Sequence, residues 1–160
     1  MMNTRIPRKA ERHLVLIDIE NLASTPSPTQ EEVTSVVRAL RGVLPGLDCA
    51  QRIVACSHHA APNVAFAFPA ARHLWRSGPD GADLALVSVL DNERVDDRFG
   101  HVTICSGDGI FAASAARLGG AGVDVTVVSL KGHLAARLEL AARYVRFLTP
   151  SVQQAARSAS

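Results

Sequence analysis

The sequence is poor in aromatic residues, which make up 4% of its 160 residues. Alanine pairs such as Ala112-Ala113, Ala115-Ala116 and Ala135-Ala136 recur instead, and alanine is the strongest helix former. We therefore expect an aliphatic, helix-rich core. A domain of this length buries roughly 70% of the surface that its unfolded chain exposes. The hydrophobic share of 48% is enough for one such core without metal or disulfide support.

Cysteine is also scarce, and its spacing excludes two classes of small domain. Cys49, Cys56 and Cys105 lie in or beside apolar runs, and no two of them form a CxxC pair. This pattern fits neither a disulfide framework nor a zinc motif, so we expect three buried, reduced thiols. No apolar run reaches the 18 or so residues that span a bilayer, and residues 1–12 have no hydrophobic signal core. We expect a cytoplasmic protein with no membrane partner.

The sequence also lacks a large excess of charge of either sign. Seventeen basic residues against fifteen acidic ones give a net charge of +2, which excludes a protein that holds nucleic acid by overall charge alone. Basic contacts must then be local. Residues 1–11 carry Arg5, Arg8 and Lys9 and are predicted as a loose basic arm, which either follows a nucleic-acid backbone or is only solvated. Residues 12–149 form the predicted domain, and residues 150–160 a flexible tail.

Near-continuous apolar runs alternate with helical patterns along the domain. The runs predict strands at 13–19, 52–56, 73–76, 101–105, 123–130 and 144–148. The periodic segments predict helices at 33–42, 82–92, 109–120 and 134–142, and we also expect a short helix in the less regular segment 62–70. Strands that alternate with helices indicate βαβ units, a largely parallel sheet and right-handed crossovers.

Three aspartates are predicted to lie near the carboxyl ends of these strands. Asp18 ends the first strand, Asp108 follows the fourth, and Asp83 opens the helix before the fourth. Parallel sheets bind their ligands at this edge. Asp83 and Asp108 also share a helical stripe with the apolar residues that follow them. A carboxylate on such a stripe is costly unless it caps a helix or binds a cation, and for either residue alone the N-cap is the simpler explanation.

The convergence of Asp18, Asp83 and Asp108 favours a cation over capping. Clustered carboxylates repel one another and need a hard divalent cation to neutralise them. A site of oxygen ligands, without cysteine or histidine at zinc spacing, indicates Mg²⁺ or Mn²⁺. Such a cation activates water and stabilises charge on a phosphodiester. The predicted reaction class is phosphate-ester hydrolysis.

Four blocks of the sequence together resemble the NYN branch of the PIN-like nucleases: LIDIENL at 16–22, DGADLAL at 80–86, SGDGIF at 106–111 and GVDVTV at 122–127. They occur in the family's order and span most of residues 12–149. The resemblance implies a three-layer α/β/α PIN-like (Rossmann-like) fold with a mainly parallel five- or six-stranded sheet, and a metal-dependent ribonuclease. It also implies that Asp18, Asp83 and Asp108 bind Mg²⁺ or Mn²⁺, and that Asn21 holds the first of them or the RNA substrate.

Two positions depart from the family pattern and keep other functions open. Ile110 replaces the second aspartate of the usual Ser-Gly-Asp-Ser-Asp-Phe block, and Val89 stands where many members carry a further aspartate. Asp91 lies about 80° off the face of Asp83, so we expect it to be solvated. The first alternative is therefore a catalytically degenerate RNA-binding or assembly module. The second is a phosphatase of the haloacid dehalogenase type, because 18–20 and 107–109 resemble its two aspartate motifs.

Further polar residues follow the predicted strands at the same edge. His58 and His59 follow the second strand and Lys131 and His133 the fifth, where each contacts a substrate phosphate or is simply solvated.

Ser106 and Gly107 precede a helix N-terminus, where backbone N–H groups favour an anion, or they form an ordinary turn. Glu20 is either a fourth ligand or directed to the opposite face. Trp75 is predicted in the core and not as a base-stacking platform.

One small domain leaves no room for a separate RNA-binding module. Substrate choice then comes from the rim of the site, or from a homodimer or a protein partner.

Overall fold

The computed structural model describes residues 5–149 and contains a six-stranded sheet whose strand pairs are all parallel. The strand order is β3-β2-β1-β4-β5-β6. The strands are β1 (His13–Asp18), β2 (Gln51–Cys56), β3 (Arg72–Trp75), β4 (His101–Cys105), β5 (Asp124–Leu130) and β6 (Tyr144–Leu148). All six predicted strands are confirmed. The order reverses between β1 and β4, so neighbouring crossovers leave the sheet in opposite directions there.

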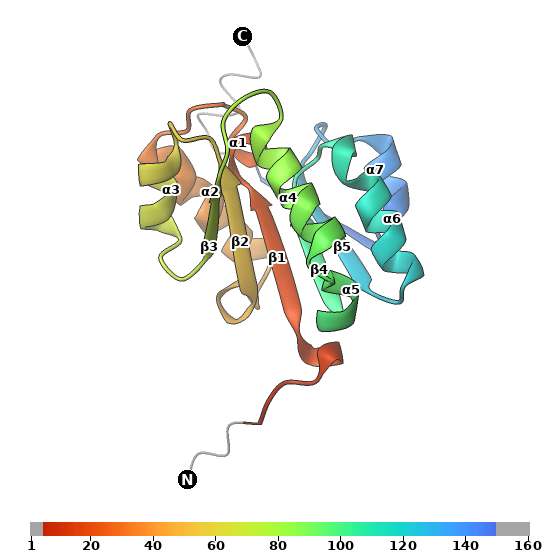
Figure 1. The fold of residues 1–160 in the computed structure, drawn as a ribbon. Coiled ribbons are helices and arrows are strands. Elements are labelled where there is room, and N and C mark those ends of the chain that lie inside the picture. The colour runs from red at the N-terminus through yellow and green to blue at the C-terminus, as the bar shows by residue number, and fades with distance from the viewer. Residues whose placement is uncertain (1–4, 150–160) are drawn as a thin grey trace.

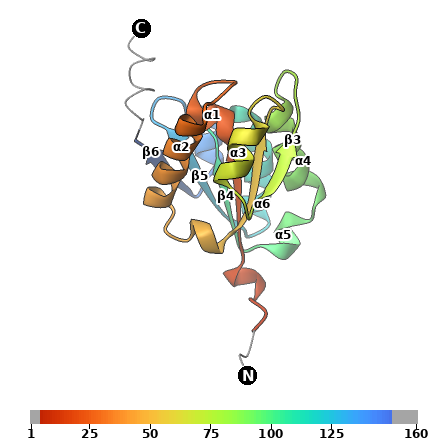
Figure 2. The ribbon, with the colours of Figure 1, turned by 90° about the vertical axis from the view of Figure 1, so that its left-hand side faces the viewer.

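Helices cover both faces of the sheet (Figures 1 and 2). One face carries α1 (Ile19–Ala23), α2 (Gln30–Val43) and α3 (Ala61–Ala67). The other carries α4 (Gly81–Asn92), α5 (Val95–Arg98), α6 (Ala112–Gly120) and α7 (Ala136–Ala141). Short 3₁₀ turns lie at Lys9–Glu11, Leu47–Cys49 and Gly109–Phe111. The predicted three-layer α/β/α Rossmann-like arrangement is confirmed.

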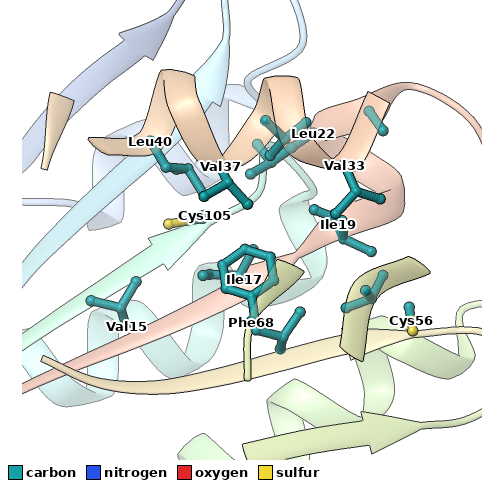
Figure 3. Packing of buried hydrophobic residues seen from close by; sticks show 14 of the residues in the cluster. Val15, Ile17, Ile19, Leu22, Val33, Val37, Leu40, Cys56, Phe68 and Cys105 are labelled. Carbon is teal, nitrogen blue, oxygen red and sulfur yellow. The ribbon is translucent and has the colours of Figure 1, made fainter. Parts of the chain in front are cut away.

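The two helical layers explain why the strands read as continuous apolar runs. Along β1, Leu14 and Leu16 pack under α4 to α7, whereas Val15 and Ile17 pack under α1 to α3. Successive side chains of β1 therefore enter the two cores on opposite faces of the sheet in alternation. Val33, Val37 and Leu40 of α2 form one side of the core that lies between the sheet and α1 to α3 (Figure 3). Full burial of each aliphatic side chain contributes roughly 1.5–3 kcal/mol.

The boundaries of several elements differ from those predicted. β1 ends at Asp18 and not at Ile19, because the Asp18 carboxylate accepts a hydrogen bond from Asn21 N (3.3 Å) and caps α1. A helix of five residues is too short to show a period, so α1 was not predicted. α2 begins three residues before the predicted start, where Thr29 and Glu32 form a capping box, and Gly42 lies within this helix instead of ending it.

Other differences concern the second half of the chain. The sequence predicted no helix at α5, which has only four residues. The helix predicted at 109–120 is a 3₁₀ turn followed by α6, and the last helix is shorter than predicted. The helix predicted at 62–70 is confirmed as α3. Asp91 is not simply solvated, because it accepts hydrogen bonds from Ser114 Oγ (2.8 Å) and Arg117 Nη2 (3.2 Å).

Two predicted core residues lie at the surface. Trp75 is 49% exposed because β3 is an edge strand with a neighbour on one side only. Cys49 is exposed in the 3₁₀ turn before β2, whereas Cys56 and Cys105 are buried as predicted. Burial raises the pKa of the Cys56 thiol to about 12. Among the helices of residues 5–149, none is long and apolar enough to cross a membrane.

The part of the predicted basic arm that the structure describes is not loose. Lys9–Glu11 forms a 3₁₀ turn, Arg5 Nη2 lies 3.7 Å from Glu11 Oε1, and the carbonyl of Arg12 accepts hydrogen bonds from the N–H groups of Gly100 and His101. The predicted arm at 1–4 and the predicted tail at 150–160 lie outside the described residues.

Candidate functional site

The predicted acidic residues lie at the carboxyl ends of β1 and β4, where the strand order reverses (the upper edge of the sheet in Figure 1). Asp18 is the last residue of β1, and Asp108 follows β4. Asp83 lies in the first turn of α4, which packs on both β1 and β2. This point is where open α/β sheets bind their ligands.

Asp18 is the buried member of the site, with 2% of its surface exposed. Its Oδ2 accepts a hydrogen bond from Ser106 Oγ (3.1 Å), and its Oδ1 accepts one from Asn21 N (3.3 Å). Since alternate residues of β1 point to opposite faces, the Asp18 side chain lies on the α4 side together with Leu14 and Leu16. Neighbouring donors and packing therefore fix this carboxylate in one place.

Asp18 and Asp83 are hydrogen-bonded to each other through their side chains. Burial raises the pKa of Asp18. Burial, the contact with Asp18 and the charges of Asp108 and Asp80 together raise the pKa of Asp83 to about 9. Near neutral pH the two carboxyl groups therefore share a proton. A pair in this state exchanges its proton for a cation more readily than it accommodates two free negative charges.

Asp108 has the capping role that the sequence left open. Its Oδ1 accepts a hydrogen bond from Ile110 N (2.9 Å), and its own N–H donates to Ser106 Oγ (3.2 Å). Ser106 thus connects Asp18 with Asp108. The negative charge of Asp108 contributes to the raised pKa of Asp83, so the third aspartate acts on the pair electrostatically.

A pocket of about 180 Å³ opens beside the pair. Four carboxyl groups line it, from Asp18, Glu20, Asp80 and Asp83, together with Asn21, Gly78, Gly81 and Ala82. Glu20 lines this pocket and does not lie on the opposite face, and its Oε1 accepts a hydrogen bond from Ser57 N (2.6 Å). Asp80 was not predicted as a site residue, although it belongs to the sequence block at 80–86. Its position directly before the Gly81 that opens α4 is the signal that could have identified it.

The turn after β4 is held by its own backbone donors. Gly107 N donates to Asn21 Oδ1 (3.0 Å), and the Gly107 carbonyl accepts from Ala135 N (2.9 Å). A Cβ on Gly107 would collide with the carbonyl oxygen of His133, so this approach requires glycine. The Asn21 side chain therefore connects α1 with the turn after β4, and its predicted role toward the metal-binding aspartate or the substrate stays a prediction. The N–H groups expected to face an anion donate inside the protein, and contact of Ser106 and Gly107 with substrate stays a prediction.

The donor set of the pair fits a hard divalent cation. Mg²⁺ is commonly held by one or two carboxylates and keeps several of its waters, and Asp18 and Asp83 supply such oxygens beside a small polar pocket. Within residues 5–149, no group of three or more histidine, cysteine, aspartate or glutamate side chains has the geometry of a metal site. Direct ligation by Asp108 accordingly stays a prediction, and Asp18 and Asp83 are the residues that would hold the ion.

The predicted basic residues lie around the site at the surface. His58 Nδ1 lies 2.7 Å from Ser77 Oγ, and Lys131 and His133 are exposed beyond β5. Sequence reasoning missed Arg137 of α7, whose guanidinium lies against the backbone of Gly109. The Arg137 guanidinium places a positive charge beside Gly109, the residue that follows Asp108. No local sequence motif identifies Arg137.

The two positions that depart from the family pattern belong to the hydrophobic core. Val89 is 3% exposed within the cluster under α4, and Ile110 packs against the same cluster. An aspartate at Val89 would be buried among apolar side chains. The acidic site of this chain is therefore confined to the residues around Asp18 and Asp83.

Comparisons with known proteins identify the fold and leave the function open. No protein-family model matches the chain, and no curated protein sequence matches it. A Vibrio parahaemolyticus protein of unknown function has a similar structure, with a TM-score of 0.54 and 12% identity over 90% of this chain and 97% of its own.

Two YcaC proteins are also similar in structure. YcaC of Pseudomonas aeruginosa has a TM-score of 0.50 and 17% identity over 92% of this chain and 80% of its own. YcaC of Escherichia coli, described as an octameric hydrolase of unknown specificity, has a TM-score of 0.50 and 16% identity over 91% and 80%. At these identities the likeness shows the α/β/α fold alone. Neither YcaC protein is named as an NYN domain, so that resemblance stays a prediction.

Proposed function

We propose that this protein is a metal-dependent ribonuclease that hydrolyses RNA phosphodiester bonds at the acidic pocket. The observation that carries the proposal is the hydrogen-bonded pair of Asp18 and Asp83 beside a pocket lined by four carboxyl groups. The pair lies at the point of the sheet where α/β proteins bind ligands. The sequence blocks that resemble NYN nucleases contain both residues, and the hydrolase described among the proteins of similar fold fits the same reaction class.

Each residue of the site has a role in this reaction. Asp18 and Asp83 would hold Mg²⁺ or Mn²⁺, which when bound lowers the pKa of water and neutralises charge on the phosphodiester. Ser106 and Asn21 orient Asp18 through the hydrogen bonds that it accepts. Asp108 fixes the turn after β4 and adds negative charge near Asp83. Arg137, beside Gly109, and Lys131, exposed after β5, would contact the phosphates of a strand.

One observation supports a second function, a degenerate module that binds RNA without cleaving it. Val89 and Ile110 pack in the core, so the acidic set is smaller than in the nucleases that the sequence resembles. A phosphatase with Asp18 as nucleophile is less compatible with the structure, because this carboxylate is buried and held by two donors.

The test is cleavage of single-stranded and structured RNAs by the purified chain with Mn²⁺ or Mg²⁺. We expect Asp18→Asn and Asp83→Asn to lower the cleavage rate by at least about a hundredfold. Asp97→Asn is the matched control, because this exposed carboxylate pairs with Arg94 on α5, and we expect its activity to be unchanged.

Calorimetry separates the two functions. Binding of Mn²⁺ that is lost in both active-site variants supports the nuclease. Tight RNA binding without metal binding or cleavage supports the degenerate module and overturns the nuclease proposal. Retention of full activity by Asp18→Asn would also overturn it.

A further inference from the structure

A second hollow, of about 310 Å³, lies at the opposite edge of the sheet from the acidic pocket. Its polar lining consists of His13, His101, Thr103, Thr126, Tyr144 and Arg146. β1 joins the two sites, because His13 begins this strand and Asp18 ends it. Five steps of about 3.3 Å separate the two residues by roughly 17 Å. The hollow and the acidic pocket are therefore separate sites and share no lining residue.

The strand register builds the floor of the hollow from polar side chains. Thr103, Thr126 and Tyr144 are partners in neighbouring strands β4, β5 and β6. Partners in a parallel sheet point to the same face, so these three form one polar row. His13 and His101 are partners in β1 and β4 and begin the adjacent row. Further along the same face, Ile17, Cys105 and Val128 are apolar and covered by helices.

These polar groups converge on one another at close range. His13 Nε2 lies 2.7 Å from Thr103 Oγ1, and the rings of His13 and His101 stand edge to face with centroids 6.2 Å apart. Arg146 Nη1 donates to the carbonyl of Val43 (2.5 Å), at the end of α2. This bond holds the guanidinium over the hollow. Thr103 is 2% exposed, and the contact with His13 satisfies its buried hydroxyl.

The charges around His13 are mainly positive. Burial, His101 and Arg146 lower the pKa of His13, so its two neighbours repel a proton there. Asp124 begins β5 in the row of His101, and it is ion-paired with Arg143 as well as lying 3.6 Å from His101. A bound anion would offset this repulsion.

The remaining charged groups near His13 lie on the segments that pack beside it. Glu11 and Arg12 line an adjoining hollow. On the β2 side, Asp48 is ion-paired with Arg52 and Arg41. Among the described residues, His13 and Arg146 are the basic groups lining the hollow that have no carboxylate partner, whereas His101 faces Asp124.

We propose that this hollow binds a phosphate group, either inorganic phosphate or the phosphate of a small ester. A phosphate dianion accepts hydrogen bonds only, and the hollow offers a guanidinium, two imidazoles, two threonine hydroxyls and a tyrosine hydroxyl. Guanidinium and phosphate match in geometry as well as in charge. The volume lies at the lower end of the range of small-molecule pockets, which leaves room for a phosphate and a short attached group.

NMR titration of the histidine ring protons tests the proposal on the intact protein. Addition of inorganic phosphate is expected to shift the His13 and His101 signals and to raise the pKa of His13. The raised pKa of His13 is the signature of binding at this place, because a bound anion stabilises the protonated imidazole. Ribose 5-phosphate, tested in parallel, identifies the source: tighter binding than inorganic phosphate indicates an ester, and equal binding indicates the free ion.

Two variants localise the binding. Arg146→Gln removes the cation from the hollow and is expected to weaken phosphate binding about tenfold. Arg94→Gln is the matched control, since this exposed arginine pairs with Asp97 on the other side of the sheet. The proposal is overturned if millimolar phosphate leaves the His13 signal and its pKa unchanged. Equal weakening by the two variants would also overturn it, because it would indicate attraction by net charge only.

Discussion

The proton shared by Asp18 and Asp83 should make the stability of this protein fall as pH rises. The pKa of Asp83 is about 9 in the folded protein, against 3.8 for an unperturbed aspartate. Between these values the folded chain holds up to one proton more than the unfolded chain, so the free energy of unfolding decreases with increasing pH. The limiting slope for one proton is about 1.4 kcal/mol per pH unit. Asp83 is only half buried, and solvent screening reduces this slope, so we expect a loss of about 1 kcal/mol from pH 6 to pH 8.

The Asp83→Asn variant removes this pH dependence of the free energy of unfolding and keeps the contact with Asp18. An asparagine amide is neutral at every pH and donates to the Asp18 carboxylate as the protonated acid does. We expect the variant to be more stable than the wild-type protein by about 1 kcal/mol at pH 8, and to differ little from it at pH 6. His13 and the two buried cysteines have the same surroundings in both proteins, so their contributions cancel in the comparison. Urea unfolding followed by circular dichroism at several pH values measures the difference.

Parallel pH profiles of the two proteins would refute this reasoning, because they would show that Asp83 is ionised in the folded state. A variant that is less stable at pH 8 would refute it as well. Asp97→Asn again serves as the control, since its exposed carboxylate should leave the profile unchanged.

Three further predictions concern the site and the surface. Ser106→Ala leaves a buried oxygen of Asp18 without its donor and should lower the free energy of unfolding by about 2 kcal/mol, measured by urea denaturation; an unchanged midpoint would contradict the bond. Gly107→Ala forces its Cβ against a backbone carbonyl and should cost at least about 2 kcal/mol in the same assay, whereas a stable variant would show that the turn can move. Cys49 should react rapidly with a thiol reagent, and the two buried cysteines only after addition of denaturant; fast reaction of all three would contradict their burial.

The strands could be predicted because their chemistry is local. Each contains a short apolar run, and in the central strands burial on both faces makes successive residues hydrophobic. The helices α1 and α5 could not be predicted, since each is shorter than two helical turns and shows no period. Trp75 was placed wrongly for a different reason. Its side chain is apolar, but whether β3 is a central or an edge strand depends on the order of all six strands.

The candidate site was predictable in part. The position of Asp18 and Asp108 after their strands follows from the sequence, because parallel strands present their carboxyl ends at one edge. The sequence does not show which group each carboxylate contacts. Asp83 reaches Asp18, whereas Asp108 turns to Ile110 N and caps a helix, and both arrangements were compatible with the same spacing.

The sequence by itself determined an α/β fold with a largely parallel sheet and with acidic residues at the carboxyl ends of its strands, because hydrophobic period and strand alternation are properties of neighbouring residues. The tertiary structure alone decided which carboxyl groups share a proton, which backbone donors are already used, and which polar side chains meet at the amino ends of the strands. These outcomes depend on strand order and register, which join residues that are distant in the sequence, and small distances there control both pKa and hydrogen bonding.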